Sequence, residues 1–340
     1  MRVPRPSAVL SPNRPRLQTA DDDQIQGLLR QSHVVWGWGM SLEDYLELWR
    51  RVRTTPFARR RAAFLAWVAP DGTVLSSLKR YRVPARIDGE YATASFLAAV
   101  FTPPRFRRRG HAGALITAVL ERARDEGDRV AVLFSDVGTE FYGRLGFHAL
   151  PATEFRAKLG RAVRSGSPGI LLEPMTAADL DDVRRAHDAS IPAGCRLWVE
   201  RDAEIWGHLR HRSHSFFELL GRADARMRCR VARRGGRFFG YVIGVEVPGA
   251  WEVREVGAAD GTAAGCTETL QAAAAEAWNR RSRVARGWLD PDLVDALPGW
   301  RAVHGPRARA VAMVAMLDPG LDPAMLTAAG AVQLGPLDQF

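Results

Sequence analysis

The chain has 340 residues, of which 46% are hydrophobic and 25% charged, a composition typical of a globular protein long enough to bury two cores. No run of eighteen apolar residues occurs, which excludes a transmembrane helix. The formal net charge is +10, but lysine contributes only Lys79 and Lys158, and the arginines are spread over the whole chain. Such a spread is typical of GC-rich codon usage and gives no reason to expect a nucleic-acid partner, although a basic surface attracts anionic cofactors.

The N-terminus and the cysteines indicate the cellular compartment of the protein. Residues 1–15 are basic and rich in proline without an apolar segment, so we expect a flexible lead-in and not a signal peptide. Three cysteines, Cys195, Cys229 and Cys266, lie far apart. They favour a reducing, cytoplasmic location and argue against disulfides or a zinc site.

Residues 16–159 are predicted to form a first domain. The pattern of apolar and turn residues indicates a strand, two helices, three antiparallel strands, a helix, a strand and a short helix. The expected strands are 16–20, 62–69, 73–83, one that ends at Thr102, and 130–135; the expected helices begin at Asp21 and Ser41, and a third covers 110–126.

An arginine-rich turn joins the strand that ends at Thr102 to the third helix. Pro103 and Pro104 end the strand, because proline has no N–H to donate to a ladder. A helix N-terminus with small residues exposes unpaired N–H groups and the positive end of the helix dipole, and arginine adds charge. We therefore predict an anion site formed by Arg107, Arg108, Arg109, Gly110, His111, Ala112 and Gly113.

Two motifs in this part of the chain resemble those of the GNAT N-acetyltransferase superfamily. The first is R-x-x-G-x-A at Arg107, Gly110 and Ala112, and the second is FYGRLGF at Phe141–Phe147. The resemblance implies an α/β (α+β) fold, in which a mixed, mostly antiparallel sheet is flanked by helices. It also implies that acetyl-CoA is the cosubstrate and that its pyrophosphate binds on the arginine-rich turn.

The resemblance further implies roles around the thioester. Tyr142 takes the place of the family's general acid, and a phenol of pKa near 10 can protonate a departing thiolate. The competing interpretation is an aromatic residue that only packs against Phe141 and Phe147. In the family the strand before the turn splays from its neighbour, and its backbone then holds the pantetheine arm; here that backbone belongs to Val100, Phe101 and Thr102.

The proton acceptor for the attacking amine stays open. A primary amine of pKa about 10 is protonated at pH 7, so a carboxylate or a water chain must remove its proton. Asp136 and Glu140 are the carboxylates closest to Tyr142 in the sequence, although Asp136 equally suits capping of the next helix. The C-terminal carboxylate of Phe340 is a further candidate.

Two further sets of side chains have alternative interpretations. Trp36 and Trp38 lie between the first two helices, where GNAT domains wall their acceptor groove, and core packing is the alternative. His208, His211 and His214 recur every three residues on a predicted helix, and we expect them on its surface without a metal.

Residues 170–340 are predicted to repeat the first domain after a Gly- and Ser-rich linker at 160–169. The expected elements are a strand at 170–174, a helix after it, a helical segment over 198–220, a hairpin over 226–247, a strand at 251–256 and a helix at 267–280. The counterpart of the arginine-rich turn, GAADGTAAG, contains no arginine, and no tyrosine corresponds to Tyr142. We therefore expect a degenerate copy and one active site per chain; two active CoA sites is the competing view.

The longer phrases VFTPPRFRRRGHAG and FSDVGTEFYGRLGF resemble the fungal lysine acetyltransferases. This resemblance implies a small amino-acid amine, such as the ε-amine of free lysine, as acceptor. The enhanced intracellular survival aminoglycoside acetyltransferases share the arginine-rich turn and the tandem arrangement, but add a third domain for which we expect no room. Aminoglycoside, polyamine or protein-lysine acceptors and a non-catalytic CoA-binding module are the alternatives; neither nucleic acid nor membrane is expected as a partner, and the oligomeric state stays open.

Overall fold

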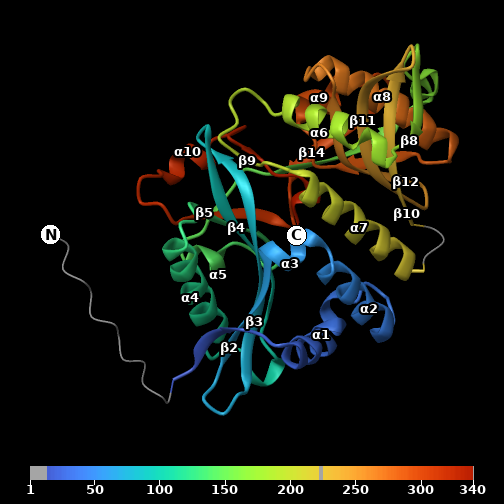
Figure 1. Ribbon diagram of the computed structural model, residues 1–340. Helices are drawn as coiled ribbons and strands as arrows, with labels where there is room; N and C mark the ends of the chain where they lie inside the picture. Colours follow the sequence, from blue (N-terminus) through green and yellow to red (C-terminus); the bar gives the residue numbers. More distant parts are fainter. Residues whose placement is uncertain (1–13, 222–224, 340) are drawn as a thin grey trace.

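The computed structural model describes residues 14–221 and 225–339, so nearly all of the predicted lead-in lies outside the described residues. Within these ranges the chain forms two mixed sheets, each flanked by helices (Figure 1). The predicted fold class, two tandem α/β units with mostly antiparallel sheets, is confirmed. No helix of the described residues is both long and apolar enough to cross a membrane.

The first half of the chain follows the predicted order closely. Its strands are β1 (Arg16–Thr19), β2 (Ala62–Val68), β3 (Val74–Ile87), β4 (Glu90–Phe101), β5 (Val130–Ser135), β6 (His148–Ala149) and β7 (Thr153–Leu159). Its helices are α1 (Asp22–Trp36), α2 (Leu42–Arg53), α3 (Pro56–Arg61), α4 (His111–Asp125) and α5 (Glu140–Gly143).

Local capping explains where the first helices begin. The Asp21 side chain accepts from the backbone N–H of Gln24 at 2.8 Å, and Gln24 bonds back to Asp21. Ser41 caps α2 in the same manner through Asp44. Each cap satisfies an N–H group that the helix itself leaves unpaired, which is why both starts are readable from the sequence.

The second half adds further strands and helices. Its strands are β8 (Ile170–Pro174), β9 (Leu197–Val199), β10 (Arg226–Arg234), β11 (Arg237–Val247), β12 (Ala250–Ala258), β13 (Val284–Gly287), β14 (Trp300–Pro306), β15 (Val311–Met316) and β16 (Val332–Gln333). Its helices are α6 (Leu180–Ala189), α7 (Ala203–Leu219), α8 (Ala263–Asn279), α9 (Pro291–Asp295) and α10 (Pro323–Thr327).

One predicted element begins in the wrong place. The helical segment expected from Trp198 starts only at Ala203, because Leu197–Val199 is strand β9, which pairs with β3 of the first sheet. Asp202 caps α7 by accepting from the N–H of Ile205 at 2.9 Å. The sequence pattern missed β9 because a three-residue strand is too short to show alternation.

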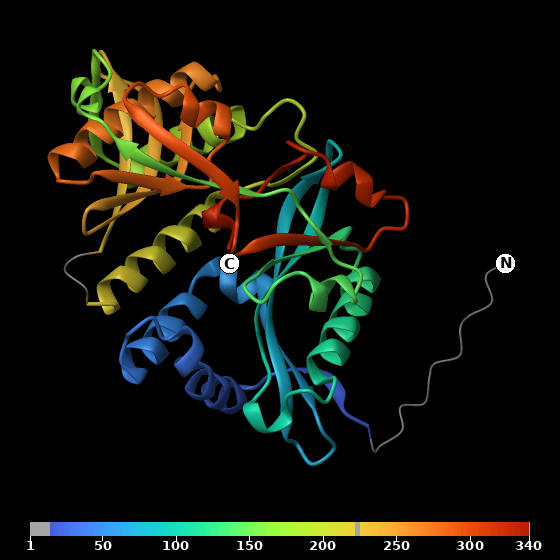
Figure 2. The same cartoon turned by 180° about the vertical axis from the view of Figure 1, so that it is seen from behind.

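The two sheets exchange a strand. β15, near the end of the chain, runs antiparallel to β5 and also pairs with β6, which places it inside the first sheet (Figure 2). In return β7, at the end of the first half, lies between β13 and β14 of the second sheet. The order of the first sheet is therefore β1-β2-β3-β4-β5-β15-β6, and that of the second is β14-β7-β13-β12-β11-β10-β8.

The exchange bears on the predicted division of the chain at 160–169. That segment contains a short 3-10 helix, Arg161–Ser165, whose Val163 is fully buried. The segment therefore contributes to the second core, although its Gly and Ser content is typical of a linker. The division into domains remains a prediction.

Helix α7 of the second half packs on α2 and α3 of the first half (Figure 1). Its buried Ile205 and Leu209 share one apolar cluster with Val83 of β3. The two halves consequently have a common core, which fixes the surfaces that face each other across α7.

A buried ion-pair network fastens the end of the chain to the second sheet. The Arg201 guanidinium donates to both carboxylate oxygens of Glu255 on β12, at 2.9 and 2.7 Å, and to Asp338 at 2.8 Å. The Tyr241 hydroxyl donates to the same Glu255 carboxylate at 2.7 Å. Arg201 is 2% exposed, so its charge depends on these partners.

We predict that Arg201→Met strongly destabilises the protein. The substitution leaves the carboxylates of Glu255 and Asp338 buried without their cation, and breaking a buried pair in this way costs about 3–5 kcal/mol. Denaturant unfolding monitored by tryptophan fluorescence measures the loss. Arg50→Met, in the exposed pair with Glu47, is the control and should leave the midpoint nearly unchanged; equal shifts in the two variants would contradict the importance of the network.

Candidate active site

Strands β4 and β5 separate at one end of the first sheet. They pair in parallel from Ala94 opposite Val130 to Leu97 opposite Leu133, and the pairing stops there although β4 continues to Phe101. Beyond Leu97, β4 contains an irregularity opposite β3, where Ala99 takes a positive φ of 50°. The bulge and the loss of pairing open a gap between the strands beyond Leu97.

The arginine-rich turn follows directly after this gap. Arg108 has a positive φ of 61° and Gly110, the N-cap of α4, a positive φ of 80°. No side chain caps α4, so the N–H groups of its first turn are free to meet a ligand. Arg107 Nε donates to the carbonyl of Thr102 at 3.1 Å, which ties the turn to the end of β4.

The charge of this turn is not neutralised by the protein. Arg108 and Arg109 are exposed and form no ion pair with any acidic side chain of the described residues. Both arginines directly precede Gly110, so their charge adds to that of the positive end of the 15-residue helix α4. The residues present fit a pyrophosphate, and the predicted cofactor contacts, His111, Ala112 and Gly113 included, lie together here.

The corresponding helix of the second half has a different N-terminus. Thr262 caps α8 by accepting from the N–H of Gly265 at 3.0 Å. The Asp260 carboxylate accepts from the N–H of Thr262 at 3.0 Å, and thus places a negative charge where α4 has arginines. Gly261 has no free space, because a Cβ there would lie 2.3 Å from the carbonyl oxygen of Ala189. These three features disfavour an anion at α8.

Tyr142 lies on α5, beside the first turn of α4. A Cβ placed on Gly113 would lie 3.8 Å from Leu145 Cδ2, which shows how closely the α5 segment approaches the turn. The Tyr142 ring packs edge-on against Phe141 and Phe147, with centroid distances of 4.9 and 6.0 Å. Tyr142 therefore packs as the competing interpretation expects, in a segment whose Leu145 approaches the first turn of α4.

Burial changes the acidity of Tyr142. Loss of solvent raises the pKa of the phenol to about 12, and the negative charge of Asp136 acts in the same direction. Tyr142 is therefore protonated at every physiological pH, but it is a weaker acid than the ordinary phenol that the sequence analysis assumed. A group of this kind stabilises a developing thiolate mainly as a hydrogen-bond donor.

Asp136 does not cap α5. Its Oδ1 accepts from the backbone N–H of Ala310 at 3.0 Å, in the loop just before β15, and α5 has no side-chain cap. Helix capping, the alternative considered for Asp136, is therefore wrong. Glu140 is exposed at the start of α5.

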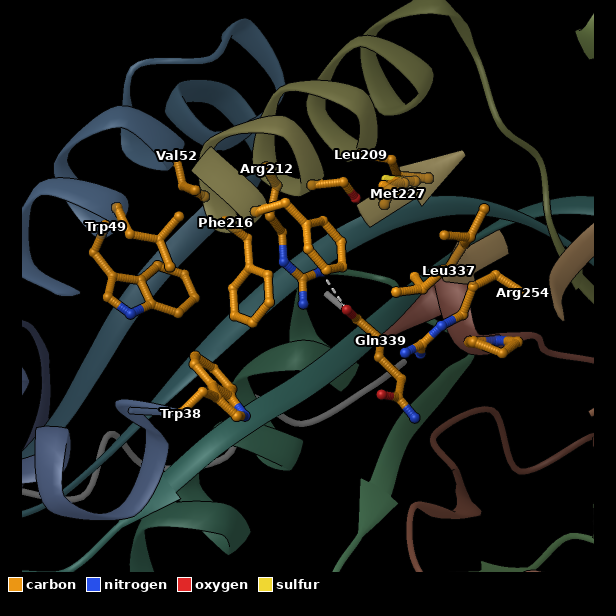
Figure 3. A pocket seen from close by; sticks show the side chains of 15 residues that line it. Trp38, Trp49, Val52, Leu209, Arg212, Phe216, Met227, Arg254, Leu337 and Gln339 are labelled. Carbon is orange, nitrogen blue, oxygen red and sulfur yellow. Dashed lines mark hydrogen bonds between the residues drawn. The ribbon is translucent and has the colours of Figure 1, made fainter. Parts of the chain in front are cut away.

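Two adjoining pockets flank α7. The first lies between α7 and α2, and the second reaches the separated end of β4 at Ala98 and Ala99. Their cavity volumes are about 210 and 190 Å³, so each is small beside a typical ligand site of about 300–1,000 Å³. Trp38, Trp49, Arg212 and Gln339 line both pockets, and we call the combined space the cleft. Figure 3 shows the first pocket, with Trp38 and Trp49 on one side and Leu337 on the other.

Both predicted tryptophans lie in the wall of the cleft. Trp36 lines the second pocket, and its ring lies 6.0 Å from that of Phe101. Trp38 is 50% exposed and meets Phe216 of α7 edge-on at 5.3 Å. Asp136 also lines the second pocket, together with Ala98 and Ala99 of β4. The sequence-predicted acceptor residues and the end of β4 are thus neighbours.

Two basic side chains of the cleft, the buried Lys79 and the half-buried Arg212, could not be predicted from the sequence. Lys79 on β3 is 5% exposed, and its Nζ lies 2.7 Å from the centroid of the Trp49 ring. Burial lowers the pKa of Lys79 well below 10.5, and Arg212 and Arg53 lower it further. Arg212 reaches the cleft from α7. Neither residue belongs to a sequence motif. They meet only because the exchange of strands and the packing of α7 bring them together.

The end of the chain enters the cleft. Gln339 lines both pockets, and its carbonyl accepts a hydrogen bond from Arg212 Nη1 (Figure 3). Asp338 lines the second pocket while it pairs with Arg201. The Phe340 carboxylate, named above as a candidate proton acceptor, lies outside the described residues.

The histidine prediction needs correction at one position. His208 is 1% exposed, not on the surface, and its Nδ1 lies 2.8 Å from Thr55 Oγ1. Burial lowers its pKa to about 3, with further contributions from Arg212 and His211. The side chain is therefore neutral and links α7 to the start of α3. Among the described residues no group of three or more His, Cys, Asp or Glu side chains is arranged to hold a metal.

We predict that Lys79→Met raises the thermal midpoint at pH 7. The pKa of Lys79 is depressed in the folded state, so the unfolded chain holds the proton more tightly than the folded chain does, which favours unfolding below pH 10.5. The gain should shrink as the pH approaches 10.5, where the unfolded lysine loses its proton. Scanning calorimetry between pH 7 and 10.5 measures this, with exposed Lys158→Met as the control; a lowered midpoint at pH 7 would contradict a depressed pKa for this amine.

Comparison with known proteins agrees with this geometry. Residues 16–150 match the family model described as an acetyltransferase (GNAT) domain. No curated protein matches the sequence. The matched range contains the separated strands, the arginine-rich turn and Tyr142.

Solved structures show the same fold over most of the chain. A GCN5-related N-acetyltransferase from Anabaena variabilis ATCC 29413 is 16% identical with a TM-score of 0.67, over 90% of this chain and 73% of that chain. One from Kribbella flavida is 22% identical with a TM-score of 0.63, over 89% and 71%. A tandem GNAT protein from the clavulanic acid biosynthesis pathway is 16% identical with a TM-score of 0.52, over 90% and 100%. At these identities the likeness shows the fold alone, and the match to the acetyltransferase (GNAT) domain covers residues 16–150, which is less than half of the chain.

Proposed function

We propose that the protein transfers the acetyl group of acetyl-CoA to a primary amine of a small molecule at one site per chain. The observation that carries the proposal is the uncapped N-terminus of α4, with Arg108 and Arg109 beside it, at the end of the gap between β4 and β5. Acetyl-CoA supplies an activated thioester when its pyrophosphate binds on this turn. The backbone of Val100, Phe101 and Thr102 lies between the turn and the bulge, where it can hold the pantetheine arm.

We divide the reaction between Tyr142 on α5 and residues of the cleft. Tyr142, protonated at physiological pH, donates to the leaving sulfur. Asp136 lies exposed in the second pocket and is our candidate to accept the proton of the amine, through water if needed. Glu140 and the Phe340 carboxylate remain candidates for the same step. Trp36 and Trp38 enclose the acceptor.

We also propose an identity for the acceptor. The resemblance of the arginine-rich turn and the Tyr142 segment to fungal lysine acetyltransferases suggests the ε-amine of free lysine. Aminoglycosides, polyamines and protein lysines are alternatives, as is a CoA-binding module without catalysis. We propose a cytoplasmic location from the three cysteines, none of which is disulfide-bonded.

Release of free thiol from acetyl-CoA tests the function directly. The panel contains free amino acids including lysine, polyamines, aminoglycosides and a basic peptide. We expect thiol release with small primary amines. Tight CoA binding without release for any amine would contradict the enzyme and favour the binding module.

We predict that Tyr142→Phe lowers kcat by about 100-fold while the affinity for acetyl-CoA stays near that of the wild type. The hydroxyl is needed for the leaving thiolate, and removal of a general acid typically costs a factor of this order. Steady-state kinetics at pH 7.5 measures both constants. Tyr91→Phe, at an exposed position on β4, is the control; an unchanged kcat in Tyr142→Phe would leave packing as the role of Tyr142.

We predict that one molecule of CoA binds per chain and that Gly110→Ala weakens this binding about tenfold. Alanine at a positive φ costs roughly 1–2 kcal/mol and distorts the turn. Gly236→Ala is a matched control, because Gly236 has a φ of 77° and equally open space in a remote hairpin turn. Isothermal titration calorimetry gives both the number of CoA molecules per chain and their affinity. Two CoA molecules per chain would show that α8 also binds CoA.

A further inference from the structure

Arg212 occupies the junction of the two pockets of the cleft. It comes from α7 in the second half, and its side chain points into the space between Phe216, Trp38 and Gln339 (Figure 3). One nitrogen donates to the Gln339 carbonyl. Within residues 14–221 and 225–339, no carboxylate lies within ion-pair distance of Arg212. A guanidinium has five donors, so most of its hydrogen-bonding capacity is directed at the cleft.

Arg212 is half-buried at this junction. Burial lowers the pKa of Arg212, the interaction with Tyr81 raises it, and the charge of Arg254, which also lines the first pocket, lowers it. Asp338 pairs with Arg201, Asp136 accepts from the Ala310 N–H, and neither carboxylate lies within ion-pair distance of Arg212. An anion at the junction would offset the positive charge of Arg212.

The two pockets differ in character on either side of Arg212. The wall of the first pocket is mostly apolar and includes Trp38, Val52, Phe216, Met227 and Leu337. The second contains the end of β4, at Ala98 and Ala99, and the Asp136 carboxylate. An apolar group suits the first pocket, whereas an amine that attacks the thioester must lie in the second.

We infer that the acceptor is an α-amino acid with an apolar or aromatic side chain. This inference rests on the proposed function. The carboxylate pairs with Arg212 at the junction, the side chain fills the first pocket and the α-amine enters the second, which matches the branching of an α-amino acid at one carbon. The α-nitrogen forms a bond to the acetyl carbon as the C–S bond breaks; of the two protons lost by the ammonium, one balances the thiol and the other leaves to solvent.

Matched acceptors separate the carboxylate from the rest of the molecule. Phenylalanine, its methyl ester and phenethylamine share an aromatic body and an amine, but only the first carries a negative charge. Rates are compared at equal concentrations of the neutral amine, so that differences in amine pKa do not enter. We expect kcat/KM for phenylalanine to exceed that of either analogue by on the order of 100-fold, the size of a charge-assisted hydrogen-bonded pair.

Arg212→Met should reduce the ratio of kcat/KM for phenylalanine to kcat/KM for either analogue to nearly one, mainly by raising the KM for phenylalanine. Arg210→Met is the control, because Arg210 lies on the exposed side of α7, outside the cleft, and it should keep the preference of the wild type. The comparison of phenylalanine with its analogues in the wild type tests the inference even where Arg212→Met fails to fold.

Three results would overturn the inference while the proposed function stands. They are equal rates for phenylalanine and its uncharged analogues, an unchanged preference in Arg212→Met, and a higher kcat/KM for lysine with Nε-acetyl-lysine as the product by mass spectrometry. Absence of turnover with every amine, alongside tight CoA binding, would instead contradict the proposed function itself.

Discussion

The exchange of β7 and β15 between the two sheets is the constraint on which the site depends. Because β15 is inserted between β5 and β6, the loop before it reaches Asp136, and the chain after it returns to the cleft. Arg201 then fixes this last segment through Asp338. The shared core beneath α7 holds Arg212 over the end of β4. A cleft between two units that merely touched would change with their relative motion, whereas the exchanged strands restrict that motion.

The two halves show how one fold loses or keeps an anion site through a few atoms. At α4 a glycine N-cap leaves the first-turn N–H groups free, and arginines add charge. At α8 the Thr262 hydroxyl takes one of those N–H groups, Asp260 adds a negative charge, and the backbone at Ala189 fills the space beside Gly261. The dipole is present in both helices. Capping, charge and room therefore decide which one can bind a phosphate.

Much of the first half could be predicted from the sequence because its signals are local. The Asp21 and Ser41 caps, the prolines after β4 and the short-range motifs around Gly110 and Tyr142 each act within a few residues. The exchange of strands, β9, the burial of His208 and the approach of Arg212 to Lys79 could not be predicted, since they depend on contacts between residues more than a hundred positions apart. Lys79 and Arg212 belong to this second class, whereas the motif residues of α4 and α5 belong to the first.

We propose that a single acetyl-transfer site, at the N-terminus of α4, serves the whole chain. Hydrogen–deuterium exchange with and without CoA is the sharpest test, because a bound pyrophosphate protects the N–H groups that hold it. We expect slower exchange over residues 98–102 and 108–113, with no change over residues 259–266 at the start of α8. Protection at 259–266, or none at 108–113, would contradict it.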